Sequence, residues 1–463
     1  MSNLSTSHPA LDGVDTVIVA TPDIQGRLVG RRVPADQFAT ACTDGVAVST
    51  CVYGWDIGQS ADLLATGVLP YTGMQTGMGD FYLFPDLDTL RPAAWLDRTA
   101  ICLAHAREPD GSDTPPCPRH LLRRQIERLR AAGYTASVGT ELEYLLVEGT
   151  AGDLYRRDYA GLQPVTHRPS DFLIAEGDDL AGFFSDLRAV LAAADVPVEA
   201  TQLEWGLGQI ETTIVHGEPM AMADRHTLYK MAVKRMAARA GRTASFMAKP
   251  LDDGPGNSCH VHLSLRALDG TPAFWAEGEP HHVSPVLRHA VAGALANAPD
   301  LMAWYAPMVN SYRRIRSQDA AGWGQTWGID HRFTSARVVG HTPGSIRMEF
   351  RLAGADANPY LVLAGLIASI VDGIEHQLDP GPPETGNPYE RPAGAIPSTS
   401  ATPWPGSAPA SSPVPRSVMP WWTTTPRWPS SSGTCSSTAS PTGNAAATST
   451  PSDPPRAPTN PPK

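Results

Sequence analysis

The last 73 residues of the chain, Arg391 to Lys463, limit how much of it can fold. They include 17 Pro, 14 Ser and 11 Thr but no Leu, Phe or Tyr. Because such a segment cannot bury enough apolar surface to offset its conformational entropy, we predict that residues 391–463 are disordered. The other 390 residues carry 31 basic and 46 acidic side chains, a net charge of −15, and the folded structure is expected there.

The composition argues against several classes of protein. The whole chain has 463 residues and a net charge of −11, which argues against nucleic acid or an anionic membrane as its main partner. The sequence contains no run of about 18 apolar residues, so we expect no membrane-spanning helix. Residues 1–12 lack the pattern of a secretory signal, and the six cysteines form no CxxC pair. These features are typical of a reduced, cytoplasmic protein.

Helix and strand patterns mix along the folded part without strict alternation, which favours an α+β fold. Apolar residues at helical spacing predict helices over residues 118–132, 179–194, 219–240, 284–305 and 358–378. Strand patterns lie between them, over residues 137–147, 208–214, 260–265 and 345–352. Shorter strand patterns begin with residues 14–19 and continue to about Cys102.

Two of the predicted strands alternate polar with apolar residues, so that each places its polar groups on one face. Glu141 and Glu143 share a face of the first strand. An isolated pair of this kind is most often only a solvated strand face. His260, His262 and Ser264 share a face of another strand, and two histidines beside a hydroxyl favour a functional site.

Two further segments concentrate charge. Glu204 and Glu211 flank a glycine-rich turn, and the second of them begins a new strand. Glu349 stands between Arg347 and Arg351 on a strand with the same alternation. This last pattern indicates either a ladder of salt bridges or a site for an anion.

Taken together, the predicted strands supply five carboxylates, a histidine and several arginines. Mg²⁺ prefers oxygen ligands, and Mn²⁺ also accepts an imidazole. Arginines beside such metals suit phosphoryl transfer, because charge on the moving phosphate must be neutralised. The sequence contains no Walker A motif and no GxGxxG motif before a helix. The residues therefore predict metal-dependent phosphoryl transfer without a P-loop or Rossmann nucleotide site.

Five blocks, in this order along the chain, resemble motifs of the glutamine synthetase family, most closely those of its bacterial type I branch. The blocks are residues 139–144 (GTELEY), Glu204 with 208–211 (GQIE), 246–250 (FMAKP) with 260–264 (HVHLS), 310–314 (NSYRR), and 327–332 (WGIDHR) leading to Glu349, Arg351 and 358–361 (NPYL). The resemblance implies a small amino-terminal β-grasp domain over residues 13–105. It also implies a large catalytic domain over residues 113–390, built on an antiparallel sheet flanked by helices.

The resemblance further implies an ATP-dependent ligase that passes through a γ-glutamyl phosphate and uses Mg²⁺ or Mn²⁺. The implied metal ligands form two sets: Glu143, Glu204 and Glu211 in one, and Glu141, His260 and Glu349 in the other. The implied glutamate-binding residues are Gly256, Arg314 and Arg351; the implied catalytic residues are Arg314, Arg332 and Arg351. Implied ATP contacts are His262, Ser264, Arg337 and Arg347. The implied partners are glutamate, ATP and a small amine, and the implied assembly is a homo-oligomer of stacked rings, such as a dodecamer.

Several positions depart from the family pattern of an ammonium-using enzyme. Val48 stands where the family has an aspartate, and Ala320 stands where it has a glutamate on a flap, although Asp319 is a neighbouring carboxylate. Pro255 and Ser258 replace an Asn and a Gly in the loop before the histidine strand, which leaves the glutamate contacts there open.

Loss of the two carboxylates removes the electrostatic site for ammonium. We therefore predict a primary amine as the acceptor, such as ethanolamine or a polyamine, with ethanolamine preferred. Two alternatives stay open: a glutamine synthetase that uses ammonium, and a catalytically inactive member of the family that acts as a sensor.

The tail also departs from the family pattern. Members of the family end in a segment such as V-T-D-W-E-x-x-R-Y-F. A shift of reading frame over residues 439–450 yields codons that allow this ending, and residues 421–423 shifted in the same way allow Val-Asp. We interpret the tail from about Pro397 as a frameshifted translation, which resequencing of the gene would test.

Overall fold

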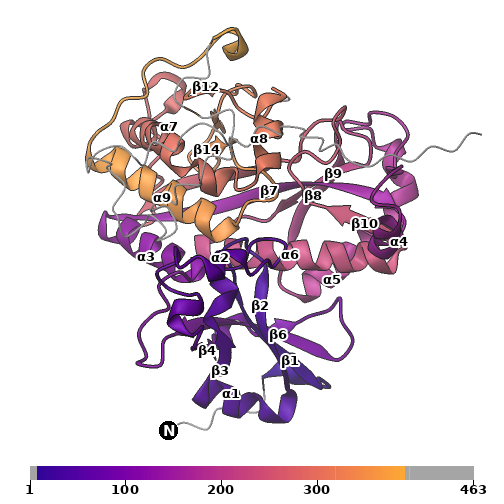
Figure 1. Cartoon of the computed structure of the whole chain (residues 1–463). Coiled ribbons are helices and arrows are strands. Elements are labelled where there is room, and N and C mark those ends of the chain that lie inside the picture. The colour runs from indigo at the N-terminus through magenta and orange to yellow at the C-terminus, as the bar shows by residue number, and fades with distance from the viewer. Residues whose placement is uncertain (1–7, 319, 392–395, 397–463) are drawn as a thin grey trace, which may run out of the picture. The chain divides into compact units, whose positions relative to one another are not determined.

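A computed structural model describes residues 8–318, 320–391 and 396, and Figure 1 shows its ribbon. The described part contains two β-sheets accompanied by helices, as the predicted α+β class requires. Asp319 and residues 397–463, the tail that we interpret as frameshifted, lie outside the described residues, as does nearly all of the segment 391–463 that we predict to be disordered.

The amino-terminal sheet has the strand order β2-β1-β6-β4-β3, and β5 also pairs with β6. Strand β1 runs antiparallel to β2 and parallel to β6. The strands are β1 (Thr16–Pro22), β2 (Leu28–Pro34), β3 (Val46–Ser49), β4 (Asp80–Pro85), β5 (Arg91–Pro92) and β6 (Thr99–Arg107). Two short helices, α1 (Phe38–Asp44) and α2 (Asp62–Ala65), lie between β2 and β4 in sequence.

Strand β1 separates two hydrophobic cores because its side chains alternate between its faces. Val17 and Val19 are fully buried in a small core with Phe81. Ile18 and Ala20 point the other way, into the large core that the remaining elements share. The β-branched run that predicted a strand at residues 14–19 is thus buried on both sides.

The large sheet has the strand order β12-β13-β14-β11-β7-β9-β8, with β10 also paired to β7. Its strands are β7 (Tyr134–Glu148), β8 (Val198–Leu203), β9 (Gln209–Ile214), β10 (Arg242–Ser245), β11 (Cys259–Ala267), β12 (Trp327–Ile329), β13 (Ala336–Val339) and β14 (Arg347–Phe350). All pairs are antiparallel except β12 with β13, which are parallel. The predicted antiparallel sheet is therefore correct except at this edge, where residues 330–335 connect two short strands that run the same way.

Helices cover this sheet and join it to the amino-terminal part (Figure 1). They are α3 (Pro118–Ala131), α4 (Ala151–Arg156), α5 (Ala181–Ala193), α6 (Pro219–Arg239), α7 (Pro285–Tyr305), α8 (Val309–Arg316) and α9 (Pro359–Glu375). Proline occupies the first turn of α3, α6, α7 and α9, where no backbone N–H is required. In the described part of the chain, no helix is long and apolar enough to cross a membrane.

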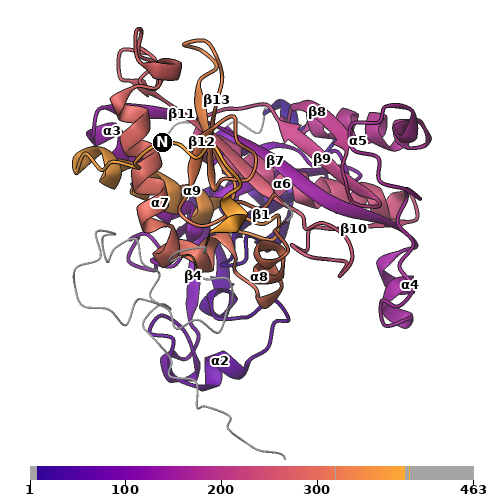
Figure 2. The ribbon, with the colours of Figure 1, turned by 90° about the horizontal axis from the view of Figure 1, so that it is seen from above.

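Helices α7 and α9 lie side by side at the end of the large sheet opposite α4 and α5 (Figure 2). Two glycines allow their backbones to touch. A Cβ atom on Gly293 would lie 2.0 Å from the carbonyl oxygen of Ser369, and one on Gly373 would lie 2.1 Å from that of His289. Nearly all of α9 is consequently buried, which explains its apolar sequence.

A buried ion network fastens the amino-terminal sheet to the helices. Arg119, in the first turn of α3, donates to Asp86 just after β4 at 2.8 Å and to Asp224 of α6 at 3.0 Å. The hydroxyl of Tyr360 on α9 donates to Asp224 at 2.7 Å. Arg119 and Asp224 are each less than 6% exposed, so each charge depends on the other for compensation.

We expect Arg119→Ala to destabilise the protein by about 3 kcal/mol, because it leaves Asp224 buried without its cation. Thermal unfolding should show a Tm lowered by several degrees. Arg130→Ala is the matched control, since Arg130 is exposed on the same helix. Equal Tm values for the two variants would contradict the structural role of the network.

Candidate functional site

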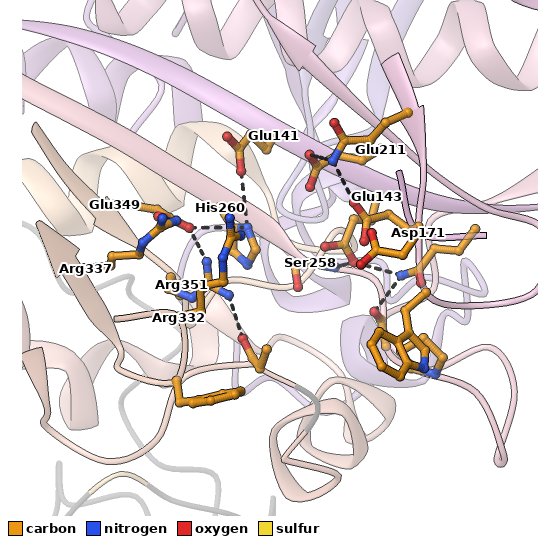
Figure 3. A pocket seen from close by; sticks show the side chains of 18 of the residues that line it. Glu141, Glu143, Asp171, Glu211, Ser258, His260, Arg332, Arg337, Glu349 and Arg351 are labelled. Atoms are coloured by element: carbon orange, nitrogen blue, oxygen red, sulfur yellow. Dashed lines mark hydrogen bonds and ion pairs between the residues drawn. The ribbon is translucent and has the colours of Figure 1, made fainter. Parts of the chain in front are cut away.

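One face of the large sheet borders a cavity of about 1720 Å³ (Figure 3). Side chains of β7, β9, β11, β13 and β14 form its floor. Loops that include residues 167–172 and 252–256, together with Ser317, Gln318 and Ala320, contribute the rest of the lining.

The long strand β7 supplies the first two acidic side chains. Glu141 and Glu143 line the cavity, whereas Leu142 is fully buried in the core on the other face. The predicted alternation is confirmed. The antiparallel register then places Glu141 opposite His260 on β11, and Glu143 opposite Glu211 on β9.

Among the described residues, two groups of side chains have the spacing of metal ligands. Within each group, one potential ligand atom from each residue lies within 4.8 Å of the others; the groups are Glu141, His260 and Glu349, and Glu143, Glu211 and His260. Glu204 borders the same cavity but belongs to neither group. The Nε2 atom of His260 is buried and has no hydrogen-bond partner in the described part of the chain. Carboxylate and imidazole donors of this kind fit Mg²⁺ or Mn²⁺.

Electrostatic repulsion also favours a bound cation. Burial and the charges of Glu141 and Glu143 raise the pKa of Glu211 to about 10. Burial, with Glu143 as the next cause, raises the pKa of Glu204 to about 7. Buried carboxylates this close remain ionised only when positive charge compensates them, which a divalent cation does.

Glu349 is compensated by arginines instead. Arg337 donates to its Oε2 atom at 2.8 Å, and Arg351 donates to its Oε1 atom. Burial raises the pKa of Glu349, but Arg351 and other nearby cations outweigh burial and lower it to about 2. Arg347 donates to Nδ1 of His262 at 3.0 Å, so the salt-bridge ladder that we considered for β14 includes Arg351 but not Arg347.

The structure brings most of the residues predicted to bind ATP or glutamate to the cavity. His262, Arg332, Arg337, Arg347 and Arg351 line it, and Arg332 is exposed there. Ser264 and Arg314 are not among the lining residues.

Arg314 is almost wholly buried behind the residues that line the cavity. Its guanidinium donates to the Ser258 hydroxyl at 2.8 Å and to the carbonyl oxygens of Arg351 and Leu352 at 3.0 and 3.1 Å. Gly256 does line the cavity, and a Cβ atom there would lie 2.5 Å from Cγ of Arg314. The glycine thus lets its loop pack directly against this arginine.

Two glutamines that sequence reasoning missed hold the carboxylates in place. Gln209 donates to Glu143 at 2.9 Å, and Gln202 donates to Glu204 and Glu211 at 2.9 and 3.1 Å. Gln209 shares a strand face with Glu211, so the alternation that identified the acids also contained its signal. Gln202 precedes the turn, where it and Leu203 replace two histidines of many relatives, but that departure did not predict its contacts with the acids.

This arrangement defines the class of the protein. A sheet face with two carboxylate–histidine groups beside several arginines is suited to binding divalent cations and to neutralising phosphorylated or carboxylate substrates.

The comparison with known proteins gives the family. The chain belongs to the glutamine synthetase family, whose catalytic domain matches residues 115–405. It is 37% identical to the γ-glutamylethanolamide synthetase GlnA4 of Streptomyces coelicolor, over 84% of this chain and 83% of that protein. It is 35% identical to the glutamate–isopropylamine ligase of a Pseudomonas species, over 81% of this chain and 82% of that protein. The solved structure of apo GmaS without ligand matches with a TM-score of 0.71 and 25% identity, over 84% of this chain and 85% of that one. The family resemblance drawn from the motifs is confirmed.

Glu211→Gln should raise the Tm of the metal-free protein, because it removes a source of repulsion, and should reduce the further rise that Mn²⁺ produces in the wild type. The folded state favours protonated Glu211, whose pKa rises from 4.5 to about 10, so wild-type stability falls as pH increases through this interval. Without metal, the amount by which the Tm of Glu211→Gln exceeds that of the wild type should therefore increase between about pH 6 and about pH 8. Thermal unfolding with EDTA and with Mn²⁺ measures both effects.

Asp252→Asn provides the control for this prediction, since Asp252 also lines the cavity but its side chain is 91% exposed. It should leave the response to Mn²⁺ unchanged. An Mn²⁺ response in Glu211→Gln as large as that of the wild type would argue against Glu211 as a metal ligand.

Proposed function

We propose that this protein is an ATP-dependent carbon–nitrogen ligase that joins the γ-carboxyl group of glutamate to a primary amine through a γ-glutamyl phosphate. The observation that carries the proposal is the similarity of the chain, over more than four fifths of its length, to a γ-glutamylethanolamide synthetase and a glutamate–isopropylamine ligase. The carboxylates and arginines of the cavity support it, because the reaction brings ATP and glutamate, both anions, together.

In this proposal the cavity holds two divalent cations, Mg²⁺ or Mn²⁺, which when bound neutralise and orient phosphate oxygens. Their ligands are Glu143, Glu204 and Glu211 for one, and Glu141, His260 and Glu349 for the other. The second set coincides with one of the two groups that have ligand spacing. The first shares Glu143 and Glu211 with the other group, where His260 takes the place of Glu204.

Different residues of the site are assigned to the two anionic substrates, ATP and glutamate. We assign Arg332, Arg337 and Arg347, with His262 and Ser264, to the phosphates and the nucleotide. Arg351 and Gly256 contribute to the glutamate site from the cavity wall. Arg314 contributes from behind, where its guanidinium holds the hydroxyl of the cavity-lining Ser258.

The acceptor is proposed to be larger than ammonia. Val48 lies buried in β3 opposite Phe81, and Ala320 lines the cavity with a methyl group only. Neither position offers the carboxylate that capture of ammonium requires, and Asp319 lies outside the described residues. Ethanolamine is the preferred acceptor, and a polyamine is the next.

The same family assignment leads us to propose a β-grasp domain over residues 13–105, a catalytic domain over 113–390 and an assembly of stacked rings. Apolar side chains exposed outside the cavity support an assembly, because a subunit interface would remove their surface from water. Ile174 is 86% exposed, and Ile57 and Met74 are exposed in the amino-terminal part; none of the three lines the cavity.

ADP release with glutamate, ATP and Mg²⁺ should be faster with ethanolamine than with ammonium, by about tenfold or more in kcat/KM, because both ammonium-binding carboxylates are missing. Isopropylamine and putrescine complete the series. A coupled assay measures ADP, and mass spectrometry identifies the γ-glutamyl amide.

Each alternative gives a different result in this assay. Turnover with ammonium that no amine exceeds would show a glutamine synthetase. Binding of ATP and glutamate without release of ADP would show an inactive sensor.

A further inference from the structure

Nine acidic side chains of the described residues line the cavity. Eight of them are proposed metal ligands, are paired with an arginine or are exposed to solvent. Five are the proposed metal ligands Glu141, Glu143, Glu204, Glu211 and Glu349. Asp330 pairs with Arg337, while Asp252 and Asp253 are exposed to solvent. Asp171 is the remaining one, and nothing described so far uses it.

Asp171 belongs to the loop beside the glycine-rich turn, on the side of the cavity where Figure 3 places Glu143 and Glu211. Its Oδ1 atom is enclosed by protein and has no hydrogen-bond partner among the described residues. It also lies close enough to Glu204 for the two negative charges to repel each other. Asp171 nevertheless lines the cavity, so a cationic ligand bound there would offset the charge of its carboxylate.

An acceptor amine is a substrate that supplies such a cation. Alkyl amines are protonated near neutral pH, as the side chain of lysine is, and so reach the cavity as cations with N–H donors. ATP carries only negative charge and is repelled by an aspartate. Glutamate also has an α-ammonium group, so the KM for glutamate distinguishes the two cationic substrates. Resting on the function proposed above, we infer that Asp171 binds the ammonium group of the acceptor amine, while the apolar groups beside it favour an alkyl amine over ammonium itself.

Apolar groups beside Asp171 fit the carbon part of such a substrate. Phe172, the next residue, and Trp205 both line the cavity while remaining more than half exposed. Their rings would lose water on contact with an alkyl chain, which favours binding. Ala320 also lines the cavity and occupies less volume than a longer side chain would. The acceptor subsite thus combines one carboxylate with an apolar wall, which suits a monoamine with a short carbon chain.

The test compares Asp171→Asn with the wild type, using ethanolamine and hydroxylamine as acceptors. Hydroxylamine is uncharged near neutral pH, so it does not need the carboxylate. The variant should raise the KM for ethanolamine about tenfold or more, the loss of one charge contact. The KM for glutamate and the kcat/KM for hydroxylamine should stay within about twofold of wild type. Asp171→Glu should restore part of the ethanolamine affinity.

Asp253→Asn is the matched control, because Asp253 lines the cavity but is exposed, and it should leave the KM for ethanolamine unchanged. The Tm rise with Mn²⁺ should persist in Asp171→Asn. Its loss would show that Asp171 is a metal ligand and would overturn the inference, as would an equal decline with ethanolamine and hydroxylamine.

The result for the wild type separates this inference from the proposed function. If the wild type uses ethanolamine and Asp171→Asn has an unchanged KM for ethanolamine, the inference is overturned but the proposed function stands. A wild type without amine-dependent ADP release contradicts the proposed function and the inference with it.

Discussion

Mutual repulsion among the carboxylates on one face of the large sheet governs this structure. Strands β7 and β9 place Glu141, Glu143 and Glu211 side by side because antiparallel pairing aligns them and period-two alternation turns them the same way. Protonation of Glu211 or binding of cations relieves this repulsion. The glutamines that bind these acids orient them without neutralising them, and this leaves the charge available to metal ions.

Two opposite sides of the cavity consequently carry opposite charge. On β7 and β9 it is rich in carboxylates, and on β13 and β14 it is rich in arginines, with His260 belonging to both metal-ligand groups. Binding of a cationic amine and an anionic acyl phosphate benefits from this division, because each finds opposite charge on its own side. The amine must lose a proton before its nitrogen can attack the acyl phosphate. Arg314 lies behind the cavity wall and donates to the hydroxyl of Ser258 within it.

The sequence was most informative where side-chain alternation and backbone geometry coincide. The predicted strand at residues 137–147 falls inside β7, and the helices predicted at 118–132 and 219–240 end within one residue of α3 and α6. These elements have long periodic patterns and strong boundary residues such as Pro118 and Gly133. Strand β8, which carries Gln202, was missed because residues 198–203 are half exposed and alternate only weakly between polar and apolar.

Site residues on loops were harder to find than those on strands. Nothing around Asp171 is periodic, so its place in the cavity depends on how the loop folds against the turn at Trp205. The burial of Arg314 was equally hidden, since the sequence shows the residue but not the Ser258 hydroxyl that engages it.

The length of β7 has a consequence for how such enzymes diversify. Glu141 and Glu143 belong to separate metal-ligand groups and are two residues apart on one extended strand, a fixed interval of about 7 Å along the backbone. The covalent geometry of the extended strand keeps this interval constant. Loops that border the cavity carry no such constraint. Mutations in them can therefore exchange one amine for another while the spacing on which phosphoryl transfer depends is inherited unaltered.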